Sequence, residues 1–189
     1  MVGRRSPRKN AAAGEKNHSG YNRYHEGVAI LSKTPFTARE ILVSDVDDET
    51  DYHTRRVLVA ETCYQGQDVM IVEGFQGEWQ RLEEALKGVQ MPLVLMGDFN
   101  NPTGQEGYRT ILASDLHLKD SHACAEIVKG EATILADIDG WEGNSRALKV
   151  DHVFVSQGVK IARSCVVLDG KEEAIIGDHY GLEVEIEWT

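Results

Sequence analysis

Apolar and polar positions alternate along the chain in blocks that predict strands and helices. Runs rich in β-branched residues and bounded by turn-forming residues predict strands at residues 27–32, 56–63 and 68–72. The last two are joined by Tyr64-Gln65-Gly66-Gln67, which is typical of a β-hairpin turn. Shorter apolar runs predict further strands at 93–96, 149–155, 162–168 and 182–187. The pattern predicts a mixed α/β (α+β) domain with a largely antiparallel, partly buried sheet.

Two segments carry helical patterns. An amphipathic helix is predicted over residues 78–89 from apolar residues at spacings of three and four. These apolar residues are Trp79, Leu82, Leu86 and Val89. Further on, Thr103 is followed three residues later by Glu106. This is the pattern of a capping box, so we expect a helix with Thr103 as its N-cap that ends near Ser114.

Composition places the chain among globular proteins. With 189 residues and 41% hydrophobic residues, one domain with a substantial core is expected. The longest apolar runs are strand-sized, so we expect no membrane span, and the basic N-terminus is not followed by the apolar stretch of a secretory signal. Three widely spaced cysteines without a metal-binding pattern favour a reducing, cytoplasmic location and a role in the core.

Charge is distributed unevenly. Residues 1–24 contain six Lys/Arg and one acid, a net charge of +5, whereas residues 25–189 contain 14 bases and 30 acids, a net charge of −16. A nucleic-acid partner is disfavoured because the body lacks the excess of basic residues that phosphate binding needs. The basic head at residues 1–17 is compatible with a nucleic-acid arm, but its composition is more simply that of a disordered segment.

The first candidate for chemistry is Asp98 with Asn100, where a buried strand ends in a loop. Asp98 can orient a nucleophilic water or hold a cation, and Asn100 can donate hydrogen bonds to a phosphoryl oxygen. The alternative is that the two residues only form an Asx turn.

Two further candidates lie nearer the C-terminus. Asp178 and His179 stand between two glycines just before the last predicted strand, and they offer a cation ligand and a general base. Asp151 lies in an otherwise apolar strand and needs a partner, because an unpaired buried charge is costly. We expect that partner to be His179, held in one tautomer as in hydrolytic triads. A structural role for the lone histidine remains open.

These pieces, in the order Gly-Asp-Phe-Asn, Val-Asp-His-Val and Gly-Asp-His, resemble the endonuclease/exonuclease/phosphatase family over residues 18–189. The resemblance implies the four-layer α/β sandwich of the DNase I-like fold and a Mg²⁺ cofactor, with Mn²⁺ as an alternative. It also implies that Asp98 and Asn100 contact the attacking water and the phosphate, that Asp151 orients the base His179, and that Asp178 lies at the metal.

Within this family, several stretches look like bacterial phosphatases that act on maltose 6'-phosphate, including Tyr52-His53-Thr54-Arg55-Arg56 and residues 138–144. Trp141 can stack on a sugar ring, and Asn144 can bind hydroxyl groups. A surface loop anchored by Trp141 explains the same residues about as well. Arg55 or Arg56 can form a planar fork for the phosphate, and the other is then a solvated strand end.

Some parts of the family pattern have no match. An N-terminal half with an Asn and the main Glu ligand of the metal is missing, as is a His-Leu dipeptide after Val72, where the chain continues into Glu73. A carboxylate at this position would repel a phosphate. The domain is therefore expected to be incomplete, with an exposed apolar sheet face that favours homo-oligomers or poor solubility.

Three functions remain open from the sequence. The leading one is a cytoplasmic, magnesium-dependent phosphomonoesterase that acts on a small sugar phosphate. The second is a magnesium-dependent nuclease with the same catalytic residues, disfavoured by the acidic body. The third is a catalytically impaired remnant that binds a phosphorylated ligand or a partner protein.

Overall fold

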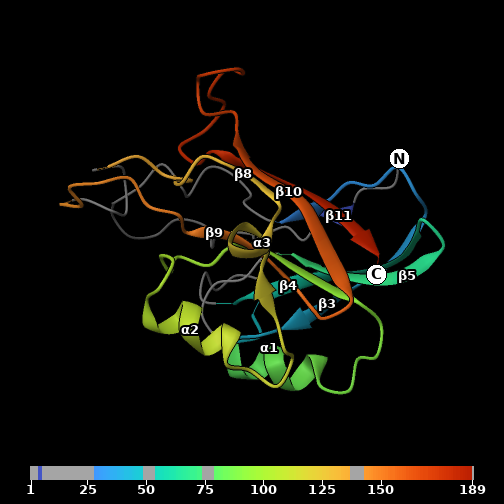
Figure 1. The fold of residues 1–189 in the computed structure, drawn as a ribbon. Helices are drawn as coiled ribbons and strands as arrows, with labels where there is room; N and C mark the ends of the chain where they lie inside the picture. Colours follow the sequence, from blue (N-terminus) through green and yellow to red (C-terminus); the bar gives the residue numbers. More distant parts are fainter. Residues whose placement is uncertain (1–3, 6–27, 49–53, 74–78, 137–142, 189) are drawn as a thin grey trace. The chain divides into compact units, whose positions relative to one another are not determined.

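The computed structural model describes residues 4–5, 28–48, 54–73, 79–136 and 143–188 (Figure 1). The chain divides into two compact units, residues 1–91 and residues 92–189. Each unit combines strands with few helices, so the mixed α/β class predicted from the sequence is confirmed. None of the described helices is long and apolar enough to cross a membrane.

The first unit is built around an antiparallel run of three strands: β3 (Phe36–Leu42), β4 (Arg56–Tyr64) and β5 (Gln67–Glu73). The predicted turn joins β4 to β5, and its central residues Gln65 and Gly66 have φ values of 52° and 82°. Positive φ at both positions matches the right-handed twist of a hairpin, which explains a glycine there. Of the basic head, the structure describes Arg4–Arg5 (β1), which pairs antiparallel with Ala29–Ile30 (β2).

The first unit also contains the first predicted helix. Helix α1 (Trp79–Leu86) buries Trp79, Leu82 and Leu86, the apolar stripe found in the sequence. It ends before the predicted boundary, because Gly88 has a φ of 81°, a left-handed conformation that terminates helices.

The second unit contains two sets of strands. In the first, β9 (Asp151–Val155) lies between β6 (Leu93–Asp98) and β7 (Lys119–Asp120), antiparallel to both. In the second, β10 (Val159–Val167) pairs antiparallel with β11 (Gly181–Trp188) and parallel with β8 (Ile127–Lys129) (Figure 1). The fully buried core of this unit includes Leu95, Ile134, Phe154 and Ile161.

Helices α2 (Glu106–Leu112) and α3 (Ser121–Cys124) complete the second unit. The predicted capping box is wrong: Gln105 occupies the N-cap of α2 and makes no side-chain cap. Thr103 instead donates its backbone N–H to Lys149 O at 3.2 Å, which commits this residue to a tertiary contact. The core role predicted for the cysteines holds for Cys165 and is wrong for Cys63 and Cys124, which are exposed.

Candidate active site

Three side chains that the sequence singled out meet in the second unit. Asp98 is the last residue of β6 and Asp151 the first of β9, and the antiparallel register places them directly opposite each other. His179 lies two residues before β11, and its backbone forms a bridge to Ile134. One ligand atom each of Asp98, Asp151 and His179 lies within 4.8 Å of the others.

Asp151 and His179 form a hydrogen-bonded dyad. The distance between His179 Nδ1 and Asp151 Oδ2 is 2.8 Å, so the contact predicted from the sequence is present. A carboxylate only accepts, so the ring proton is on Nδ1 and the lone pair is on Nε2. Burial lowers the pKa of His179, but the hydrogen bond and charge of Asp151, together with the charges of Asp98 and Asp178, outweigh it and raise the pKa above its ordinary value.

Asp98 and Asn100 form a tight local turn. Asp98 Oδ1 accepts the backbone N–H of Asn100 at 2.8 Å, and Asp98 Oδ2 accepts from Asn100 Nδ2 at 3.1 Å. Burial raises the pKa of Asp98, and the charge of Asp151 adds to this despite the hydrogen bonds of Asn100. The Asx turn left open by the sequence is therefore present. It coexists with a place in the three-residue cluster, so it does not exclude a catalytic role.

Thr133 joins the two halves of the site, although nothing in the sequence pattern singled it out. Its Oγ1 accepts the backbone N–H groups of Val150 at 3.1 Å and Asp151 at 3.2 Å. Its carbonyl accepts the N–H of Tyr180 at 2.7 Å, next to His179. Thr133 is fully buried, and one residue thus fixes both the strand of the carboxylate and the segment of the base.

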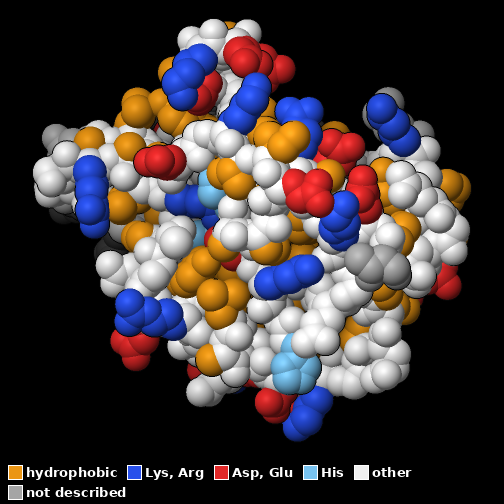
Figure 2. Space-filling model, viewed as in Figure 1, with side chains coloured by type: hydrophobic (Ala, Val, Ile, Leu, Met, Phe, Trp, Pro, Cys, Tyr) orange, Lys and Arg blue, Asp and Glu red, His pale blue; other side chains and the backbone are white. Residues whose placement is uncertain are grey.

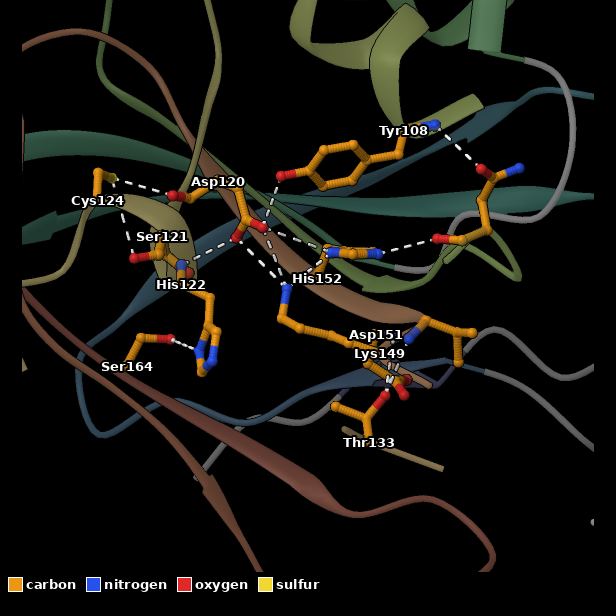
Figure 3. A network of polar contacts seen from close by, with 12 residues as sticks. Tyr108, Asp120, Ser121, His122, Cys124, Thr133, Lys149, Asp151, His152 and Ser164 are labelled. Atoms are coloured by element: carbon orange, nitrogen blue, oxygen red, sulfur yellow. Dashed lines mark hydrogen bonds and ion pairs between the residues drawn. The ribbon is translucent and has the colours of Figure 1, made fainter. Parts of the chain in front are cut away.

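A buried polar network joins Asp120 of β7 to His152 of β9 through Lys149 (Figure 3). Lys149 Nζ donates to both oxygens of Asp120, at 3.3 and 3.4 Å, and lies 2.8 Å from His152 Nδ1. Tyr108 also donates its hydroxyl to Asp120, at 3.0 Å. Sequence analysis singled out no residue of this network, although His152 belongs to the Val-Asp-His-Val motif.

The charges in this network shift the pKa values of its members. Burial alone would raise the pKa of Asp120, but the polar contacts of His152, Lys149 and His122 outweigh it and hold this pKa well below its usual range. Burial lowers the pKa of Lys149, although the negative charge of Asp120 acts to raise it. The pKa of Tyr108 is raised by burial and by the charge of Asp120. The aspartate is therefore a carboxylate in the folded protein, with cationic and hydroxyl partners.

Other predicted residues lie outside the three-residue cluster. Asp178 is exposed, and its charge contributes to the raised pKa of His179. Arg55 and Arg56 lie at the start of β4 in the first unit, where Arg56 forms an ion pair with Asp47. Trp141 falls outside the described residues.

Asn144 lines a shallow pocket of about 340 Å³ in the second unit. The pocket is mostly polar, and its lining includes Asn101, Gln105, Glu106 and Arg146. Leu148 also lines the pocket and forms a β-bridge with Ile134. Ile134 forms a second β-bridge with His179, so the pocket lies two strand spacings from His179. Asn144 Nδ2 is buried and has no hydrogen-bond partner among the described residues.

The cluster suits a hard divalent cation. Mg²⁺ is usually held by one or two carboxylates and keeps several waters. Asp98 is one such carboxylate, and Asp151 places a second negative charge directly opposite it, which is part of the reason why the pKa of Asp98 is raised. A cation at this point relieves that repulsion, so the residues fit the metal that the sequence resemblance implied.

The chain has matches among known sequence families and solved structures. The sequence model described as "Endonuclease/Exonuclease/phosphatase family" matches residues 3–179. No curated protein sequence matches the chain. Among solved structures, an endonuclease/exonuclease/phosphatase family protein from Leptotrichia buccalis superposes with a TM-score of 0.80 at 24% identity, covering 99% of this chain and 72% of that one.

Two further solved structures are similar at lower TM-scores. A mannosyl-6-phosphatase from Bacteroides thetaiotaomicron has a TM-score of 0.62 at 15% identity, covering 98% of this chain and 77% of that one. A beta toxin from Staphylococcus aureus with bound magnesium ions has a TM-score of 0.58 at 15% identity, covering 84% and 67%. At these identities the similarity shows a shared fold.

Proposed function

Because the chain belongs to the endonuclease/exonuclease/phosphatase family, we propose that it is a magnesium-dependent phosphomonoesterase that acts on a sugar phosphate. The observation that carries this proposal is the Asp151–His179 dyad, placed within 4.8 Å of Asp98. A base held by a carboxylate, next to a second carboxylate suited to a cation, is the equipment that hydrolysis of a phosphate ester needs.

In this mechanism His179 Nε2 accepts a proton from the attacking water, while Asp151 stabilises the imidazolium that forms. Water oxygen bonds to phosphorus and the bond from phosphorus to the ester oxygen breaks. The leaving oxygen takes up a proton from solvent, and His179 returns its proton to solvent, so the products are inorganic phosphate and the free sugar. Asn100 Nδ2 keeps one N–H beyond the one it gives Asp98, and this donor is available to a phosphoryl oxygen.

Asp98 and Asp178 are the carboxylates that we propose as ligands of the cation, with Asp151 adding negative charge. A bound Mg²⁺ would neutralise the charge that builds up on the phosphoryl oxygens. The charge of Asp178 already acts on His179, which supports its place near the site.

The pocket next to the site supports a sugar as the esterified group. Amide, guanidinium and carboxylate groups of Asn101, Asn144, Arg146 and Glu106 line it, and these groups bind hydroxyls through both donors and acceptors. One structural relative is a mannosyl-6-phosphatase, which is compatible with this substrate class. Maltose 6'-phosphate is the specific substrate suggested by the sequence resemblance.

Phosphate release from maltose 6'-phosphate and from p-nitrophenyl phosphate, each with and without Mg²⁺, tests the proposal. The wild type should release phosphate only with the metal, and His179→Ala should lower the rate by about 100-fold or more. His117→Asn is the matched control, because His117 is exposed and asparagine tolerates its φ of 51°. Equal rates for wild type and His179→Ala would refute the proposed chemistry.

Arg146→Ala separates the two substrates. We expect a higher KM for the sugar phosphate and little change for p-nitrophenyl phosphate, since only the sugar reaches the pocket. Cleavage of plasmid DNA would favour a nuclease instead. Acidic and basic side chains are interspersed over the face shown in Figure 2, which gives duplex DNA no support there.

A further inference from the structure

The loop after β6, which carries Asn100, is attached to the start of β9 at alternate residues. Three hydrogen bonds make this attachment: Phe99 N–H to Val150 O at 3.1 Å, His152 Nε2–H to Asn101 O at 3.0 Å, and Thr103 N–H to Lys149 O at 3.2 Å. The first and third join backbone groups and do not depend on side-chain identity. The second requires a side chain with a donor at one position, and His152 supplies it.

Asn100 lies between two of these attachment points and has a left-handed backbone, with a φ of 48°. Asparagine tolerates this conformation better than most residues, but it persists only where the surroundings enforce it. Here the bond from Phe99 fixes one side of Asn100 and the bond to Asn101 O fixes the other. The conformation in turn directs the N–H and the amide of Asn100 to the carboxylate of Asp98.

The buried network selects the tautomer of His152 that can make this bond. The Lys149 ammonium can only donate, so His152 Nδ1, 2.8 Å away, accepts from it, and the ring proton is then on Nε2. Asp120 Oδ2 lies 3.9 Å from the same Nδ1, too far for a hydrogen bond. Asp120 holds Lys149 in place, and it is fixed in turn by the Tyr108 hydroxyl (Figure 3). His152, Asp120 and Lys149 are 2%, 4% and 6% exposed, so water does not compete for these contacts.

We infer that His152 is a positioning residue: its Nε2–H, oriented by the buried Lys149–Asp120 pair, holds Asn100 and Asp98 in the geometry that catalysis requires. This inference rests on the function proposed above. Packing alone does not explain the histidine. Its ring contacts Phe99, Tyr108 and Phe154 at centroid distances of 5.8, 5.1 and 5.3 Å, and a phenylalanine would make the same contacts without two nitrogen atoms to satisfy.

His152→Phe keeps the ring and removes both nitrogens, whereas His152→Gln keeps an amide donor near the position of Nε2. Ile161→Ala is the stability control, because Ile161 is 2% exposed on β10 and makes none of the loop contacts. Three properties are compared: hydrogen exchange of the peptide 97–104 by mass spectrometry, Mn²⁺ affinity by calorimetry, and kcat and KM for p-nitrophenyl phosphate.

For His152→Phe we expect exchange of the 97–104 peptide about tenfold faster, weaker Mn²⁺ binding, and a kcat roughly 100-fold lower with little change in KM. His152→Gln should recover most of each property. Ile161→Ala should lower Tm and leave kcat unchanged. Wild-type exchange and kcat in folded His152→Phe would overturn the inference, as would faster exchange with unchanged kcat.

If the wild type has no phosphatase activity, the proposed function fails, and the exchange and Mn²⁺ measurements still decide whether His152 orders the loop. If His152→Phe does not fold, ¹⁵N NMR of the wild-type imidazole decides. A proton on Nε2 of His152 supports the inference. A proton on Nδ1 alone removes the donor to Asn101 and overturns it.

Discussion

Asp98 and Asp151 lie directly opposite each other in the antiparallel pair formed by β6 and β9, so that two carboxylates meet at one end of adjacent strands. Like charges at such a position destabilise each other, and the pKa of Asp98 is raised by burial and then by Asp151. The fold therefore brings the negative charges of Asp98 and Asp151 close to His179, the proposed base. A divalent cation is the partner that makes this arrangement favourable.

Replacing Asp98 with asparagine should weaken cation binding. Asp98→Asn keeps the shape of the side chain but removes one of two facing charges, so we expect Mg²⁺ or Mn²⁺ affinity to fall by about tenfold or more. Isothermal titration calorimetry measures this directly. Asp169→Asn, in the segment after β10 where Asp169 pairs with Lys171, should bind the ion like the wild type. Unchanged affinity in Asp98→Asn would exclude Asp98 as a ligand.

Asp151→Asn tests the dyad. Asparagine can offer its amide to His179 Nδ1 as a donor, which favours the tautomer with the proton on Nε2 and removes the lone pair that accepts the proton of water. We expect phosphate release to fall by roughly 100-fold or more, with the circular dichroism spectrum unchanged. Activity within a factor of two of the wild type would mean that His179 needs no carboxylate partner.

The three central residues could be predicted because each lies in a predicted strand or close to the end of one. Asp98 ends a buried run, Asp151 sits in a strand that is otherwise apolar, and His179 lies between glycines before the last strand. Such placements have few structural explanations, so they stand out from sequence alone. The spacing did not reveal Thr133, since a single threonine in a loop is common and its role depends on which strands come together.

The rest of the site was hidden because its residues look like surface residues in the sequence. Lys149 and Asp120 are charged, and only the tertiary fold shows that they are buried and paired. Strand β3 escaped prediction for a related reason: Arg39 and Glu40 interrupt its apolar alternation, as is common in edge strands that must not pair further. The local sequence pattern identifies helices and strands that have one clear apolar face. It does not identify residues whose burial or pairing depends on tertiary partners.

Glu73, at the end of β5, should make the protein less stable as pH rises. Burial raises its pKa to about 7 from 4.5, and its Oε2 has no hydrogen-bond partner among the described residues. Because the pKa of Glu73 is higher in the folded protein than in the unfolded chain, its protonated form stabilises the fold. This stabilisation is full below pH 4.5 and is lost as the pH rises towards 7. The carboxyl group is thus partly protonated at neutral pH, and it carries less charge than the sequence argument assumed.

Glu73→Gln measures this effect. The two proteins should have similar stability near pH 4.5, and the variant should be more stable at pH 8 by at most about 3 kcal/mol, since glutamine does not ionise. Urea unfolding at both pH values gives the comparison. Glu61→Gln, on the neighbouring strand β4, serves as the control and should show no such gain. A constant difference between wild type and Glu73→Gln across this range would contradict the assignment.

The contribution of Asp120 to stability should depend on pH in the opposite sense to that of Glu73. Its folded pKa is held below the ordinary value, so its contribution is full above about pH 4 and is lost as pH falls towards the folded pKa. Asp120→Asn leaves the Lys149 ammonium buried without its carboxylate, and we expect a loss of roughly 3–5 kcal/mol at pH 7. The gap between wild type and variant should narrow between pH 5 and pH 2, because only the wild type loses the ion pair there. Urea unfolding across this range measures the gap, and a gap of constant size would show that Asp120 acts through packing rather than through its charge.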